Sequence, residues 1–135
     1  MSRSESHHFT RPLHIAGAAI LLGVVSWGLL SPNAFVVLRT IPLSPLAFIN
    51  DVIIHCLAYT SAAVIGGLLF ANGDPAKARL VCVLLMAHGT GTELLQALIP
   101  QRTCSAMDLM ANLTGVALGS VIAMRIQRGS VNSLS

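Results

Sequence analysis

Four long apolar segments, separated by short polar breaks, dominate the chain. They cover residues 14–30, 52–71, 80–99 and 109–124. A helix needs about 20 residues to cross roughly 30 Å of hydrocarbon, and these segments approach that length. They lack the alternation of a transmembrane β-barrel, and a helix satisfies its backbone hydrogen bonds within its own segment. The pattern therefore predicts an all-α membrane protein, a bundle of four transmembrane helices.

The breaks between these segments contain residues that end helices. They read Ser31-Pro32-Asn33, Asn72-Gly73-Asp74-Pro75 and Pro100-Gln101-Arg102. One transmembrane domain is predicted over 14–126, between an N-terminal tail of 1–13 and a flexible C-terminal tail of 127–135. The first segment is long for the core of a signal peptide, and no cleavage site of the A-x-A type follows it. We therefore expect a retained anchor.

Composition and charge placement give the membrane setting and its orientation. Of the 135 residues, 54% are hydrophobic and 10% are charged, which does not suit the surface of a small soluble domain. No basic run or aromatic stacking pattern favours nucleic acid. Loop charges are unequal, and the positive-inside rule therefore predicts that both termini are cytoplasmic (N-in/C-in). One side carries Arg3, Arg11, Lys77, Arg79, Arg125 and Arg128, and the other carries Arg39 and Arg102.

Polar side chains recur at helical spacing inside three of the apolar segments. Each set falls on one helix face, and the helix directions bring all three sets to one depth near the outer boundary. Such residues are costly in lipid, so they mark a site or a set of satisfied contacts. The predicted pocket, open to the outer face, consists of Asp51, His55, Tyr59, Glu93, Gln96, Arg102, Asp108 and Asn112.

Several of these residues have an ordinary structural reading. Asp51 suits a helix N-terminus, and Ser105 with Asp108 has the spacing of a capping box. Tyr59 suits a packing role with one satisfied hydroxyl. His88, deeper in the third segment, suits a satisfied core histidine. The small residues Ala111, Gly115 and Gly119 are typical of close helix packing.

Glu93 is the member of this set that most needs an explanation. An ionised carboxylate in the membrane requires a partner or takes up a proton, and Arg102 and His55 are the natural partners. Three roles remain open for the cluster. His55 can accept a proton while Glu93 orients it, Arg102 can hold a phosphate or carboxylate of an amphiphilic ligand, or the cluster can be structural.

Metal and cofactor chemistry has no compact signature in the chain. His55 with Asp51, Glu93 or Asp108 is a conceivable ligand set, but no tight ligand motif is present. The three cysteines, Cys56, Cys82 and Cys104, share no metal spacing and are interpreted as structural. No metal and no cofactor are predicted.

Three stretches together resemble the VanZ-like family of bacterial membrane proteins. They are D-x-x-x-H-x-x-x-Y at 51–59, E-x-x-Q followed by P-x-R at 93–102, and D-x-x-x-N-x-x-G-x-x-x-G at 108–119. The first apolar segment carries no such signature. The resemblance implies a multi-pass protein of the bacterial cytoplasmic (inner) membrane. The family is named for a member associated with glycopeptide resistance, especially to teicoplanin, but a shared family does not assign that role to this chain.

Two functions of different classes follow as hypotheses. In the first, the protein binds or modifies an amphiphilic ligand in the outer leaflet, such as a lipid-linked envelope precursor or a phospholipid. In the second, it is a non-catalytic subunit or assembly factor of a larger membrane complex. A transporter is a third option, which four helices would support only as an oligomer. No reaction is assigned.

Overall fold

The computed structural model describes residues 6–31, 51–100 and 104–132, with the backbone alone at 6–15, 51, 131 and 132. Within these ranges the protein is all helical and has no strand. The helices are α1 (Ser6–Leu30), α3 (Asp51–Gly66), the π-helical turn η2 (Gly67–Ala71) that continues α3, α4 (Pro75–Gln96) and α5 (Ala106–Asn132).

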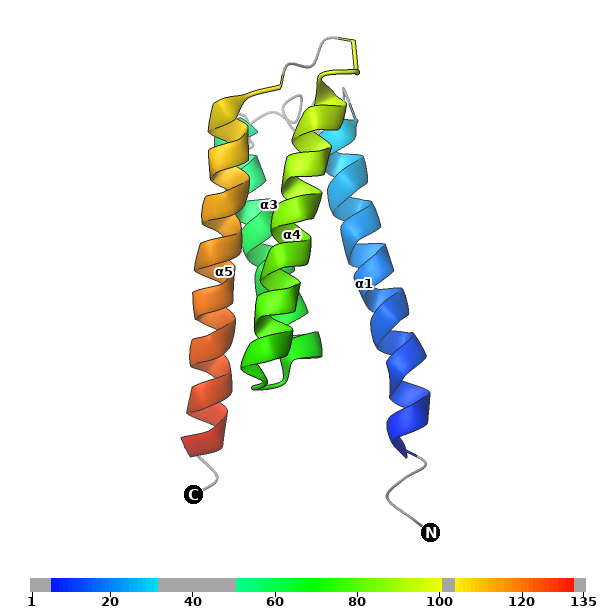
Figure 1. Cartoon of the computed structure of the whole chain (residues 1–135), viewed down its shortest axis with the longest axis vertical. Helices are drawn as coiled ribbons and strands as arrows, with labels where there is room; N and C mark the ends of the chain where they lie inside the picture. Colours follow the sequence, from blue (N-terminus) through cyan, green and yellow to red (C-terminus); the bar gives the residue numbers. More distant parts are fainter. Residues whose placement is uncertain (1–5, 32–50, 101–103, 133–135) are drawn as a thin grey trace, which may run out of the picture.

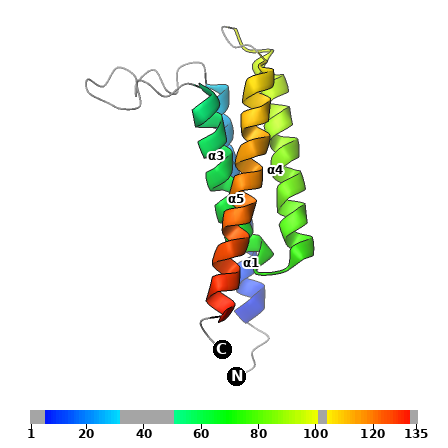
Figure 2. The same cartoon turned by 90° about the vertical axis from the view of Figure 1, so that its left-hand side faces the viewer.

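Successive helices run in opposite directions and form an elongated bundle (Figure 1). Helices α3, α4 and α5 pack on one another, and α3 and α5 share the most extensive contact. Helix α1 contacts α3 and α4 and diverges from them towards its N-terminal end (Figure 1). In the view of Figure 2, α1 lies behind α5. The start of α1, the turn at 72–74 and the end of α5 therefore lie towards one end of the bundle. The starts of α3 and α5 lie at the other.

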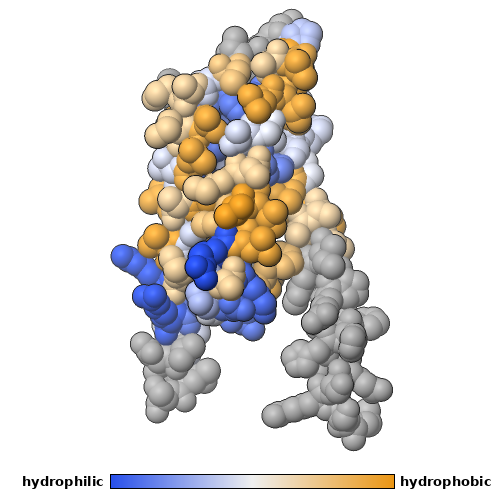
Figure 3. All heavy atoms as spheres, viewed as in Figure 1, coloured by the Kyte–Doolittle hydropathy of each residue, from blue (hydrophilic) through white to orange (hydrophobic). Residues whose placement is uncertain are grey.

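Three helical stretches are long and apolar enough to cross a membrane: Val52–Ala71, Pro75–Gln96 and Ala106–Ser130. Large apolar side chains face outward, and Trp27, Val83 and Leu94 are each at least 60% exposed. Figure 3 shows hydrophobic residues over much of the upper and middle part of this face of the bundle. The buried positions instead include His55, Glu93 and other polar groups. This distribution, apolar outside and partly polar inside, indicates a membrane protein.

Helix bounds extend beyond the apolar segments that predicted them. Helix α1 begins at Ser6, within the predicted tail of 1–13, and its apolar part over Ala16–Leu30 is shorter than the three spans. Helix α5 continues to Asn132, so residues 127–132 are helical and do not belong to a flexible tail. A helix does not stop where its side chains become polar, because its backbone bonds are local and Arg and Gln are good helix formers.

The turn predicted at residues 72–75 is present, and its residues show why α3 ends there. Asn72 and Gly73 adopt positive φ values of 45° and 82°, the left-handed conformation that terminates a helix. Asp74 then caps α4, since its Oδ1 accepts hydrogen bonds from the N–H groups of Ala76 (2.8 Å) and Lys77 (3.4 Å). Pro75 occupies the first turn of α4, where its missing N–H costs nothing.

The Asp74 cap predicts a pH-dependent stability. Backbone hydrogen bonds from Ala76 and Lys77 hold the pKa of Asp74 below its ordinary value. A depressed folded-state pKa contributes stability above the unfolded value of about 3.9 and loses it as pH falls through the folded value. Thermal unfolding in detergent should therefore show wild type more stable than Asp74→Ala at pH 6, with the difference shrinking below about pH 4. Asp74→Asn, which caps without titrating, should keep its advantage over Asp74→Ala.

Helix α4 ends at Gln96, three residues earlier than the predicted Ile99. Proline explains the difference. The ring of Pro100 would meet the carbonyl of the residue four positions earlier, and it also disfavours helical geometry in the residue just before it. Gln96 is that earlier residue. The last turn is closed instead by hydrogen bonds from Leu98 N–H to Leu95 O and from Ile99 N–H to Gln96 O, each 3.0 Å long.

A seam of small residues joins α3 to α5. Gly115 lies so close to the backbone of Cys56 and Thr60 that no side chain fits there. One turn on, Gly119 lies equally close to the Thr60 carbonyl and to Ala63. Gly115 and Gly119 thus lie at the contact between these two helices, where the sequence predicted that they pack. The close approach also sets the rotation of α5, which turns Asn112 towards α3.

Candidate functional site

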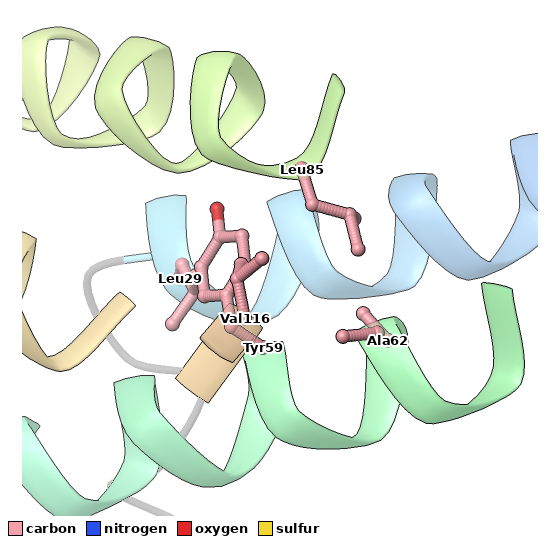
Figure 4. Close-up of a cluster of buried hydrophobic side chains, with 6 residues drawn as sticks. Leu29, Tyr59, Ala62, Leu85 and Val116 are labelled. Carbon is pink, nitrogen blue, oxygen red and sulfur yellow. The ribbon is translucent and has the colours of Figure 1, made fainter. Parts of the chain in front are cut away.

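A compact apolar cluster fills the interior of the bundle in the half that contains the N-terminal ends of α3 and α5. Tyr59, Ala62, Leu85 and Val116 meet there with Leu29, which closes the cluster from α1. Figure 4 shows the Tyr59 ring rising from α3 beside Leu29, with its hydroxyl directed towards α4. Tyr59 is fully buried, so the hydroxyl needs a partner within the protein.

Tyr59 finds its partners on α4. Its hydroxyl lies 2.9 Å from Nδ1 of His88 and 3.0 Å from Oγ1 of Thr92. The other ring nitrogen of His88, Nε2, lies 2.8 Å from the hydroxyl oxygen of Ser26 on α1. Both nitrogens of His88 are therefore engaged, as expected for a satisfied core histidine. The chain of hydrogen bonds links three helices through Tyr59 and His88.

A second set of contacts surrounds His55, and it determines which ring nitrogen carries the proton. Asn112 Nδ2 donates to the Gly89 carbonyl at 3.2 Å, which orients the Asn112 amide. Asn112 Oδ1 then faces His55 Nδ1 at 2.9 Å. An amide oxygen only accepts, so Nδ1 must be the donor. In neutral His55 the lone pair is consequently on Nε2.

The two sets meet at the backbone carbonyl of Gly89. Thr92 Oγ1 donates to this carbonyl at 3.0 Å, and Asn112 Nδ2 donates to it from α5. Because the Thr92 proton is used in this way, its oxygen is free to accept from Tyr59. The result is one continuous network that contains side chains from all four helices. Its members are Ser26, Tyr59, His88, Thr92, Asn112 and His55.

Glu93 is held differently. One oxygen, Oε1, accepts the backbone N–H of Ser105 at 2.5 Å, so the carboxylate lies at the N-terminal end of α5. The positive end of a helix dipole stabilises an anion there. Ser105 also begins the capping box, since its hydroxyl accepts from Asp108 N–H at 3.3 Å. Glu93 is 2% exposed, and its second oxygen, Oε2, is buried and has no hydrogen-bond partner among the residues that the structure describes.

Three ligand-type residues converge at this position. One nitrogen of His55 and one carboxylate oxygen from each of Glu93 and Asp108 all lie within 4.8 Å of one another. His55 and Glu93 are buried and Asp108 is partly exposed. They come from α3, α4 and α5. The sequence contains no compact metal motif, but the fold brings possible metal ligands together from three separate helices.

The structure brings only part of the predicted pocket together. His55, Glu93, Asp108 and Asn112 form one group. Tyr59 belongs to the deeper network, and Gln96 turns towards α1, where its Nε2 donates to the Leu29 carbonyl at 2.8 Å. Arg102 and the side chain of Asp51 lie outside the described residues. Among the described members, all except Asp108 are at most 2% exposed, so they form a closed cluster rather than an open pocket.

Sequence reasoning missed Ser26 and the bridge through Ser105, and it placed Thr92 near Glu93 without including it in the predicted pocket. Ser26 and Thr92 are small hydroxyl residues within apolar segments, and such residues are usually satisfied by their own helix. Thr90 behaves in that way, with its hydroxyl bonded to the Met86 carbonyl at 3.0 Å. The only available signal was the spacing of His88 and Thr92 by one helical turn.

Basic residues gather at the other end of the bundle. Lys77, Arg79, Arg125 and Arg128 lie near the 72–74 turn and the end of α5, where Figure 3 shows hydrophilic side chains. Two cavities of about 490 and 410 Å³ also lie towards this end, and both have mainly apolar linings. The polar cluster is thus separate from these cavities.

Comparison with known protein families, with curated proteins and with solved structures finds no match to this chain.

Proposed function

We propose that this chain is a VanZ-like protein of the bacterial cytoplasmic membrane that binds the polar group of an amphiphilic ligand at the outer end of its bundle. The family and the bacterial setting are supported by the three motif stretches within residues 51–119. The ligand class is a phospholipid or a lipid-linked envelope precursor, because the cluster lies close to one end of the membrane-spanning helices.

The proposed topology has four crossings with both termini in the cytoplasm. Helix α1 has 25 residues, enough to span although its described apolar part is short. The described side chains of Lys77, Arg79, Arg125 and Arg128 support a cytoplasmic location for that end under the positive-inside rule. The cluster of His55, Glu93 and Asp108 then belongs to the outer half of the membrane.

The observation that carries the proposal is the buried Oε2 of Glu93, which has no hydrogen-bond partner within the described part of the chain. Leaving a buried acceptor unsatisfied costs about 1–3 kcal/mol, and more when it is charged. A bundle of structural contacts alone would avoid that cost, as it does at Tyr59, His88 and Gln96. A hydrogen-bond donor of the ligand, such as a head-group ammonium or hydroxyl, would satisfy the oxygen. Asp108 gives the cluster a partly exposed member through which such a group can approach.

Native mass spectrometry of the protein extracted from bacterial membranes in mild detergent tests this proposal. Wild type should retain a lipid adduct that Glu93→Gln and His55→Ala reduce at least tenfold. Thr90→Ala is the matched control, because Thr90 is a polar residue of α4 whose exposed hydroxyl bonds only to its own helix.

The outcomes separate the two hypotheses. Equal adduct in wild type and in both cluster variants would show that the cluster does not bind the lipid. A stoichiometric protein partner in place of a lipid would favour the alternative, a non-catalytic subunit of a larger complex. An immunoblot of the membrane fraction should show each variant at the wild-type level, so that a smaller lipid adduct reflects weaker binding and not less protein.

A further inference from the structure

We infer that His55, Glu93 and Asp108 form a binding site for one divalent transition-metal ion. This inference deepens the proposed function, since the ion would occupy the same cluster. One lone-pair donor atom from each of these three residues lies within 4.8 Å of the other two, and the residues come from three different helices. Two of them are carboxylates, and like charges this close in a buried position repel strongly. A cation bound between the two carboxylates would attract both of them and so offset their mutual repulsion.

The tautomer of His55 fits this role. Asn112 Oδ1 accepts the Nδ1 proton, which leaves the Nε2 lone pair for a ligand. Metal-binding histidines characteristically donate their other ring N–H to an oxygen in this way, which fixes the ring and raises its basicity. The Asn112 amide is itself held by the Gly89 carbonyl. The orientation of His55 is therefore already determined by two successive hydrogen bonds.

Glu93 supplies a second independent indication. Its Oε1 is engaged by Ser105 N–H, so the carboxylate plane is anchored and Oε2 remains as the coordinating atom. This oxygen is buried and accepts no hydrogen bond from any described residue, so its lone pairs are available to a cation. Asp108 adds the third ligand and, through its partial exposure, a route of entry for the ion.

Distances and charge decide the class of ion. Ligands on one tetrahedral ion lie about 3.3 Å apart when the metal–ligand bonds are 2.0–2.2 Å. The observed atoms need to approach by about 1.5 Å at most, which small shifts of the side chains can supply, above all rotation about the soft terminal torsion of Asp108. One imidazole favours zinc, iron or manganese over magnesium and calcium, and a divalent charge balances two carboxylates. Three protein ligands leave a further position, which a ligand phosphate oxygen would suit.

Zn²⁺ binding to the purified full-length chain tests this inference. The protein in detergent is stripped with a chelator, titrated calorimetrically with Zn²⁺ and analysed for bound zinc. We expect one Zn²⁺ per chain in wild type and at least a 100-fold weaker affinity in Glu93→Gln and in His55→Ala. Asn112→Ala, which removes the hydrogen bond that orients the His55 ring, should weaken binding by about 10–100-fold.

Two controls exclude unrelated zinc binding. Asp74→Asn removes a carboxylate at the other end of the bundle, and Cys104→Ser removes an exposed thiol. Both should bind Zn²⁺ like wild type. Asp108→Asn repeats the test at a partly exposed position in case the buried substitutions do not fold, as judged by circular dichroism, and it should also weaken binding at least tenfold.

Two results would overturn the metal site. They are a wild type that binds no Zn²⁺ and cluster variants that bind Zn²⁺ like wild type. The lipid proposal can fail separately. A wild type that binds Zn²⁺ but retains no lipid contradicts only the lipid proposal, and a Glu93-dependent lipid adduct on a protein without zinc affinity contradicts only the metal site.

Discussion

Replacement of Gly119 by valine is expected to separate α5 from α3 and to lower the free energy of unfolding by about 3 kcal/mol. A Cβ at this position would overlap the Thr60 carbonyl and lie 2.7 Å from the Cβ of Ala63. The overlap is with backbone, so a rotamer change cannot relieve it and the helices themselves must move apart. Unfolding in mixed detergent micelles, followed by circular dichroism, measures the change.

Gly129 provides the matched control on the same helix. A Cβ there meets nothing within 4 Å, so Gly129→Val should change the stability by no more than about 0.5 kcal/mol. Gly115→Ala should also destabilise, because even a methyl group overlaps the Cys56 carbonyl. If Gly119→Val and Gly129→Val unfold at the same denaturant concentration, the α3–α5 seam does not hold the bundle together. A displaced α5 should also abolish the close approach of His55 to Asp108.

Truncation of Tyr59 to alanine should have a similarly large effect, about 3 kcal/mol. The ring is fully buried among Leu29, Leu85 and Val116, and its removal leaves a cavity where α1, α3, α4 and α5 meet (Figure 4). Tyr59→Phe keeps the ring and removes only the hydroxyl. It should cost about 1 kcal/mol, because Thr92 and His88 each lose a partner within the membrane.

Ser61→Ala serves as the control for the loss of a hydroxyl from α3. The Ser61 hydroxyl is exposed and donates to the carbonyl of Leu57 in its own helix at 2.9 Å, so its removal should be nearly neutral. The same micelle unfolding measurement compares the three variants. Equal stability of Tyr59→Phe and Ser61→Ala would mean that the network through His88 and Thr92 contributes nothing. Equal stability of Tyr59→Ala and Tyr59→Phe would mean that the apolar cluster does not depend on the ring.

The order of the helices, their apolar character and the turn at residues 72–75 follow from the sequence by itself. These features are local. Helical hydrogen bonds join residues four apart. The turn depends on the backbone preferences of its own residues: Asn and Gly tolerate positive φ, and the ring of Pro75 fixes φ. The spacing of four likewise places Asp108 and Asn112 on one face of α5 before any neighbour is considered. The VanZ-like resemblance also rests on local patterns, and it stays a proposal.

The contacts among the polar residues were decided only by the tertiary structure. Spacing along one helix says nothing about its rotation relative to the next, which here depends on the small-residue seam at Gly115 and Gly119. That rotation brings His55 to Asn112, directs Gln96 away to α1 and closes the cluster that the sequence predicted to be open. The same packing brings Ser105 onto one oxygen of Glu93 and brings the Glu93 carboxylate close to His55 and Asp108. The sequence determined which helices carry polar groups, and helix packing determined which of those groups can share an ion, because coordination depends on distances between helices that no spacing within a helix specifies.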